Sequence, residues 1–205
     1  MTESFDPTRR EIAAAAAQLI ADGGLDYASA KRKAARQVLG SGTSARGSLP
    51  DNDLIDAALL EHLRLYDDGH AERVARRRQV AAELMARLQA FAPYLTGAVW
   101  KGIVAEHAPI HLQLFHDNPK EVEIHLLNDG VRFDVDTTPH FRNRDEVEAI
   151  LFWWREEPVM LSIYNGDDLR GALRVGMLGA ERGNLSALQQ RIDDGLVATR
   201  LGADR

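Results

Sequence analysis

Apolar residues in the first half of the chain recur at the three- and four-residue spacing of amphipathic helices. One such run fills residues 7–22, with Asp6 as its capping residue and a glycine pair at its end. A second helix is predicted over residues 27–39, antiparallel to the first because only a tight turn separates them. Asp51 precedes a third helical pattern, and a fourth covers about residues 71–91. Everything before residue 93 is therefore predicted to be helical.

Beyond Pro93 the apolar period changes from helical to alternating. Residues 110–115 and 131–136 alternate as strands do, and two more strands are predicted within residues 149–163. A capped helix is predicted from Asn118, and a last helix near the C-terminus. These elements predict an α+β fold with a helical domain over residues 1–93 and a small mixed sheet in residues 94–205.

The composition narrows the chemistry that the chain can perform. The 205 residues include no cysteine, which excludes disulfides, thiolate metal sites and a cysteine nucleophile. No apolar run approaches the roughly 18 residues needed to span a bilayer, so a cytoplasmic protein without a membrane partner is expected. Residues 96–205 hold 12 basic and 18 acidic side chains, so the net charge of −6 lies there. Nucleic acid is therefore not an expected partner of this protein.

One stretch carries a resemblance to a known family. Thr96-Gly97-Ala98-Val99-Trp100-Lys101-Gly102 is followed by Pro109-Ile110-His111-Leu112-Gln113. This spacing resembles the signature of the nucleotidyltransferase superfamily, in which a Gly-Ser or Gly-Gly turn precedes Asp-x-Asp on the next strand. Residues 27–35, 49–52 and 111–115 also resemble a group of proteobacterial proteins of about this length. Some of that group are labelled nucleotidyltransferases and others UDP-N-acetylmuramate-alanine ligases.

The resemblance implies a metal site that this sequence has altered. Nucleotidyl transfer in the superfamily uses two divalent ions held by carboxylates. Pro109 and His111 stand at the two aspartate positions here. A third carboxylate is expected on the next strand, where Asp134 or Asp136 would supply it beside His111 and Gln113. His111, Asp134 and Asp136 are therefore the candidate catalytic and metal-binding residues.

The same resemblance assigns a nucleotide-binding role to the loop after the first strand. Gly97, Ala98, Lys101 and Gly102, with Gln113 from the second strand, are the candidates for nucleotide contact. Purely structural roles for these residues remain open as alternatives. Single glycines usually mark turns, and a histidine on a half-buried strand is more often structural than a ligand.

The other motifs provide less evidence of function. No phosphate-binding loop, dinucleotide-binding glycine pattern or nucleophile elbow is present, so the ligase label is not accepted. The basic residues Lys31, Arg32, Lys33 and Arg36 are interpreted as a solvated helix face, with anion or nucleic-acid binding as the less favoured alternative. The histidines 107, 111, 116 and 125 lack a ligand spacing typical of a metal site.

The resulting hypothesis is a degenerate nucleotidyltransferase-like protein that binds a nucleotide, another small anionic ligand or a protein partner without efficient transfer. The cofactor is left open, with a divalent metal as an alternative. Two other functions remain: an active nucleotidyltransferase with an altered metal site on His111 and Asp134 or Asp136, and a non-enzymatic scaffold for protein interaction. Carboxylates close to His111 would favour the first of these, and an apolar groove along the early helices would favour the second.

Overall fold

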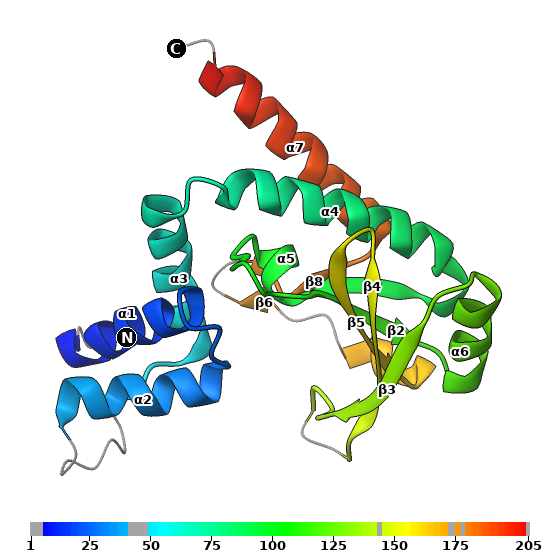
Figure 1. The fold of residues 1–205 in the computed structure, drawn as a ribbon, viewed down its shortest axis with the longest axis horizontal. Coiled ribbons are helices and arrows are strands. Elements are labelled where there is room, and N and C mark those ends of the chain that lie inside the picture. Colours follow the sequence, from blue (N-terminus) through cyan, green and yellow to red (C-terminus); the bar gives the residue numbers. More distant parts are fainter. Residues whose placement is uncertain (1–5, 41–48, 143–144, 172–174, 177–178, 204–205) are drawn as a thin grey trace. The chain divides into compact units, whose positions relative to one another are not determined.

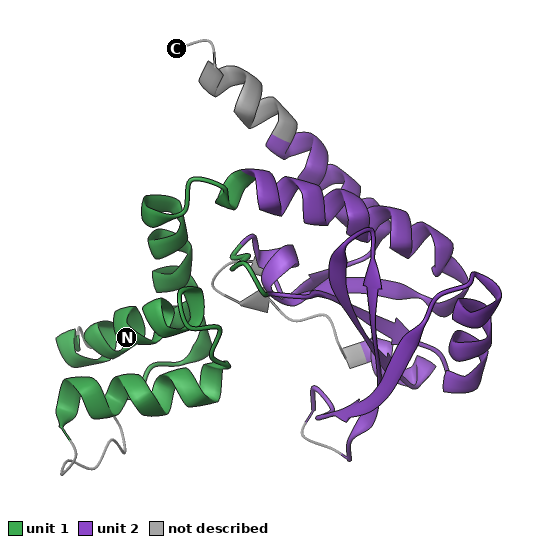
Figure 2. Cartoon of the chain, in the orientation of Figure 1, with its two compact units in different colours: residues 1–71, 103–107 green, residues 72–102, 108–205 purple. Residues whose placement is uncertain are grey.

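The computed structural model describes residues 6–40, 49–142, 145–171, 175–176 and 179–203 (Figure 1). The chain is α+β and divides into two compact units (Figure 2). Residues 1–71 with 103–107 form the first unit, and residues 72–102 with 108–205 form the second. The unit boundary thus falls inside helix α4, earlier than the expected domain boundary after residue 93.

The first unit is built from three helices that begin where their capping residues predict. These are α1 (Pro7–Ala21), α2 (Tyr27–Leu39) and α3 (Asn52–Tyr66). The side chains of Asp6, Asp26 and Asp51 each accept a hydrogen bond from a backbone N–H of the first turn. Helix α1 packs against both α2 and α3. The three helices predicted here are therefore confirmed.

Small side chains form the contact surfaces of the first two helices. The buried residues of α2 are all alanines, at positions 30, 34 and 35, and α1 buries alanines between Ile12 and Ile20. Larger apolar residues come from α3, where Leu59 and Leu63 are buried. Because alanine side chains are small, the backbones of α1 and α2 approach closely where these residues meet. The long polar side chains of α2 lie on the side away from α1.

The second unit contains a six-stranded mixed sheet in the order β3-β4-β5-β2-β1-β8. Strands β2 and β5 are parallel, and the other neighbours are antiparallel. The strands are β1 (Pro93–Thr96), β2 (Ile110–Phe115), β3 (Phe133–Thr138), β4 (Val147–Trp154), β5 (Glu157–Tyr164) and β8 (Arg182–Gly183). A separate pair is formed by β6 (Val175–Gly176) and β7 (Gly179–Ala180).

The helices of this unit connect and cover the strands. They are α4 (His70–Arg87), η1 (Gln89–Phe91), α5 (Gly97–Lys101), α6 (Pro119–Asn128), η2 (Gly166–Gly171) and α7 (Leu185–Ala203). At the start of α6, Asn118 caps the backbone and also donates to Glu121, as the sequence predicted. Between β4 and β5, Arg155 and Glu156 both have positive φ, which suits the tight hairpin there.

The two faces of the sheet differ in chemistry. One face carries the fully buried Ile110, Leu112 and Leu114 of β2. Arg77 of α4 reaches Glu157 on that face, and Lys120 of α6 approaches Glu148, so α4 and α6 cover it. The opposite face carries His111, Gln113 and Ser162 and is called the polar face below. The candidate residues His111 and Gln113 therefore lie on this face.

Candidate functional site

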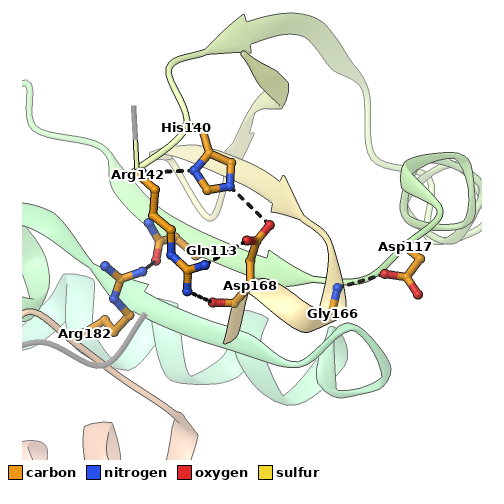
Figure 3. A network of polar contacts seen from close by, with 7 residues as sticks. All are labelled: Gln113, Asp117, His140, Arg142, Gly166, Asp168 and Arg182. Atoms are coloured by element: carbon orange, nitrogen blue, oxygen red, sulfur yellow. Dashed lines mark hydrogen bonds and ion pairs between the residues drawn. The ribbon is translucent and has the colours of Figure 1, made fainter. Parts of the chain in front are cut away.

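The centre of the polar face is a set of hydrogen-bonded side chains from three strands. The Nε2 atom of His111 on β2 lies 2.8 Å from the Oγ atom of Ser162 on β5. The amide oxygen of Gln113 accepts a hydrogen bond from the Arg182 guanidinium, which comes from β8 (Figure 3). Gln113, Ser162 and Arg182 are all buried, so these contacts are shielded from water.

Gly97 and His111 meet at this centre. Thr96, the last residue of β1, is paired with His111 on β2, and Gly97 follows with a φ of 67° as α5 begins. A Cβ atom added to Gly97 would lie 3.8 Å from the Cβ of His111 and 4.0 Å from its Nδ1. The strand-to-helix turn at Gly97 is confirmed, and it brings the glycine of the motif against the histidine of the motif.

The charge around His111 is unusual for a metal site. Burial, together with the positive charge of Arg182, lowers the pKa of His111 to about 4. The imidazole is therefore neutral at neutral pH. A neutral imidazole can bind a metal, but the adjacent guanidinium repels any divalent cation placed there. That guanidinium also lies 3.8 Å from the carboxylate of Glu181.

The expected grouping of Asp134 and Asp136 with His111 is wrong. Strand β3 does not neighbour β2 but lies at the edge of the sheet, with β4 and β5 between them. In the register, Asp134 pairs with Leu151, Leu151 with Met160, and Met160 with His111. At about 4.8 Å per strand, roughly 14 Å separates the backbones of Asp134 and His111.

The physical reason is the distribution of polar residues between strands. Asp134, Val135 and Asp136 are all exposed, which suits an edge strand with solvent on both faces. Strand β5 is mostly buried along its length, and it takes the interior place beside β2. The altered metal site built on His111 with Asp134 or Asp136 is therefore not assembled. Across the described part of the chain, no group of three His, Asp or Glu side chains could hold a metal ion.

The other loop candidates lie along the short helix α5. Ala98 and Lys101 are half-buried within it, and Gly102 ends it with a φ of 75°. A Cβ at Gly102 would lie 3.1 Å from an Nη atom of Arg78, whose guanidinium donates to the carbonyls of Val99 and Trp100. Gly102 is therefore a helix-ending residue at the far end of α5 from Gly97.

A second polar cluster lies on the same face and is structural (Figure 3). The backbone N–H of Arg142 donates to Nδ1 of His140 at 3.0 Å, so the ring proton is on Nε2. That nitrogen lies 3.2 Å from a carboxylate oxygen of the buried Asp168, which also pairs with the Arg142 guanidinium at 3.3 Å. Both nitrogens of His140 are therefore engaged in hydrogen bonds within this cluster.

A groove of about 660 Å³ lies over β3, β4 and β5, and His111 is not among its lining residues. Its lining includes Met160, the cross-strand partner of His111, together with Leu151 and Trp153. The Trp153 side chain is 71% exposed. Pro109, at the first of the two motif positions, also lines the groove. Pro109 therefore lines a groove that has an exposed aromatic ring, whereas His111 is paired with one of its lining residues, Met160.

Sequence reasoning missed Arg182, Ser162 and Trp153 as site residues. Ser162 and Trp153 belong to predicted strands but carry no motif. Arg182 comes from a two-residue strand with no periodic pattern. Only its pairing with Thr96 brings its guanidinium to β2. No signal in a single sequence indicates that pairing.

No protein-family model, curated protein or solved structure matches the chain. In the described residues, no helix is both long and apolar enough to cross a membrane.

Proposed function

We propose that this protein binds a nucleotide on the polar face of its sheet without transferring a nucleotidyl group efficiently. One observation carries the proposal: the polar face holds the buried Arg182 guanidinium beside Gln113 and also a groove lined by Trp153 and by Met160, the cross-strand partner of His111. A nucleotide has two chemically distinct ends, an anionic phosphate and a flat base. The phosphate suits the Arg182 end of this site and the base suits the Trp153 end.

Two properties of the groove support a ligand of this size and kind. Its volume of about 660 Å³ is within the range of small-molecule sites. An exposed indole offers a stacking surface to any base, worth about 1–3 kcal/mol. Gly97 supports the phosphate end, because it places no side chain against His111.

We do not propose efficient nucleotidyl transfer, because the carboxylates needed to hold two divalent ions are absent from the positions beside His111. Pro109 and His111 occupy the motif positions, and Asp134 lies on the edge strand. A guanidinium without metal-bridging carboxylates stabilises a bound phosphate but does not align an attacking oxygen with a leaving oxygen.

The experiment is a thermal-shift and calorimetric titration of the full chain with nucleoside triphosphates, with and without magnesium, manganese and zinc. A ligand that binds only the folded state raises its stability, so a saturable upward shift is expected. Trp153→Ala should weaken binding by about tenfold or more through lost stacking. Tyr66→Ala is the control, since Tyr66 is an aromatic residue of the other unit that is 76% exposed. The proposal is abandoned if no nucleotide shifts the wild type.

A scaffold function remains the second candidate, because an apolar groove follows the early helix α4. The groove has a volume of about 970 Å³, and Ala82, Met85 and Ala86 of α4 line it with Leu185 and Ile192 of α7. Exposed apolar hollows of this size are typical of interaction sites. Substituting Ala82 and Ala86 with arginine should abolish any concentration-dependent association seen by light scattering. Unchanged association would remove this candidate for self-assembly.

A further inference from the structure

Helix α2 in the first unit carries a concentration of positive charge that the site above does not use. Its sequence includes Lys31, Arg32, Lys33 and Arg36 and no acidic residue. Arg32, Lys33 and Arg36 are exposed, and Lys31 is half-buried. Within the part of the chain that the structure describes, none of the four forms an ion pair. These four residues are called the α2 cations below.

The neighbouring charges leave this positive surface uncompensated. Arg32 donates to the hydroxyl of Ser29 at 3.0 Å. The pKa of the helix-capping Asp26 is lowered mainly by the hydrogen bonds from Ser29, and the charge of Arg32 adds a smaller lowering effect. Two other carboxylates of this unit, Asp51 and Asp22, contact Arg9 and His62 instead. A solvated helix face usually mixes both signs of charge, and α2 does not.

Packing of α2 holds Arg32, Lys33 and Arg36 on one exposed side, while Lys31 lies nearer the buried alanines. The residues that it buries are Ala30, Ala34 and Ala35, and the helix packs against α1. Arg32 and Arg36 are four residues apart and therefore lie one above the other on the helix surface, with Lys33 next to them. A rigid helix thus presents a short row of cations, flanked by the exposed Gln37.

We propose that the α2 cations bind the phosphate backbone of a nucleic acid. Arginine and lysine, with glutamine and serine beside them, are the side chains that contact nucleic-acid phosphates. The sequence had favoured a solvated face, because it could not show that these charges lack ion-pair partners. The first unit as a whole carries 8 basic and 12 acidic side chains, so the proposal rests on the local grouping of cations on α2 and not on net charge.

The composition of this surface disfavours two other anionic partners. A helix that lies on a membrane inserts a large apolar face, whereas the apolar face of α2 consists of alanines packed inside the unit. A protein interface has aromatic or large aliphatic residues at its centre. The exposed cations of α2 have no such residue between them, because only alanines at positions 34 and 35 separate Lys33 from Arg36.

The test measures binding of the full chain to fluorescent duplex DNA and to single-stranded RNA, each of about 20 nucleotides, by polarisation at about 50 to 200 mM salt. The double variant Arg32→Gln/Arg36→Gln should weaken binding at least about tenfold and reduce the slope of log K against log salt by about 2. The matched control is Arg10→Gln/Arg64→Gln, which removes the same charge from exposed positions of the same unit. Circular dichroism checks that both variants are folded.

Several outcomes would overturn the proposal. It fails if neither nucleic acid binds the wild type at about 50 mM salt. It also fails if the two double variants lose affinity equally, since net charge alone would then explain the binding. Binding to vesicles containing phosphatidylserine, lost in the α2 variant while nucleic acids do not bind, would assign the surface to a membrane instead. Because nucleotide titrations probe the sheet, failure there leaves this result unaffected.

Discussion

The turn at Gly97 lies against His111, so that a methyl group added to the glycine would be 3.8 Å from the histidine Cβ. This distance is an ordinary contact, and steric conflict alone does not require glycine there. The positive φ of 67° does favour glycine, because side chains strain a left-handed backbone. A ligand in the space beside His111 would be the second reason for glycine at position 97.

We predict that Gly97→Val weakens nucleotide binding by more than its effect on stability explains. Backbone strain should lower the free energy of unfolding by about 1–2 kcal/mol, and the isopropyl group should also fill the space beside His111. Gly24→Val is the matched control, since Gly24 has a φ of 60° and its added Cβ would lie 3.7 Å from the His107 ring. Gly97→Val should lose much more nucleotide affinity, relative to its loss of unfolding free energy, than Gly24→Val does. Equal ratios would make Gly97 a folding residue alone.

We predict that removing divalent metal leaves nucleotide binding unchanged within about twofold, because Arg182 supplies the positive charge that metals supply in carboxylate-rich sites. Calorimetric titration with and without EDTA measures this directly. Nucleotidyl transfer with magnesium should be undetectable in the same preparations. A transfer activity that requires magnesium and survives His111→Ala would mean that the active site lies elsewhere.

Much of the fold follows from the sequence, because helix caps and apolar periods are local signals. The Asp6, Asp26 and Asp51 caps begin the helices of the first unit, and Asn118 begins α6. Alternation identified β2, β4 and β5 within one or two residues of their ends. Strand order is not a local signal, and there the expectation was wrong: β5, not β3, pairs with β2.

The site was less predictable than the fold for the same reason. Gly97, His111 and Gln113 come together because they belong to adjacent strands in one motif. Arg182 reaches them from about 70 residues away, through a pairing of only two residues with β1. Asp134 was assigned to the site on strand alternation, which fixes the face of a residue but not its distance across the sheet.

We predict that the sheet unit loses stability as the pH falls from about 7 to 5, partly through His111. The pKa of this histidine is about 4 in the fold against an ordinary value of 6.5. Between these values the unfolded chain binds more protons, so the free energy of unfolding decreases as the pH falls through this window. The single-group contribution is about 2 kcal/mol at about pH 5.

Urea unfolding followed by tryptophan fluorescence measures this change, since Trp100, Trp153 and Trp154 all belong to the sheet unit. His111→Gln retains a partner for Ser162 but removes the titration, so the difference between the two pH values should shrink by about 2 kcal/mol. His107→Gln, at an exposed position, should leave the difference unchanged. An unchanged difference in His111→Gln would show that this histidine is not held neutral by the fold.

We predict that Glu157 is the charged residue whose neutralisation most destabilises the sheet unit. Its carboxylate is buried, 2.6 Å from the Arg77 guanidinium and 2.6 Å from Arg76. Arg77 is also buried and donates to the carbonyl of Ala108 at 2.6 Å, which ties α4 to the segment before β2.

Glu157→Gln keeps the shape of the side chain but removes the charge opposite a buried guanidinium, so the free energy of unfolding should fall by about 3–5 kcal/mol. The control is Glu156→Gln at the exposed neighbouring position, where a change of less than about 0.5 kcal/mol is expected. Denaturant unfolding of both variants by tryptophan fluorescence provides the comparison, and similar small losses in the two would show that the Glu157 pair contributes no more than a surface ion pair.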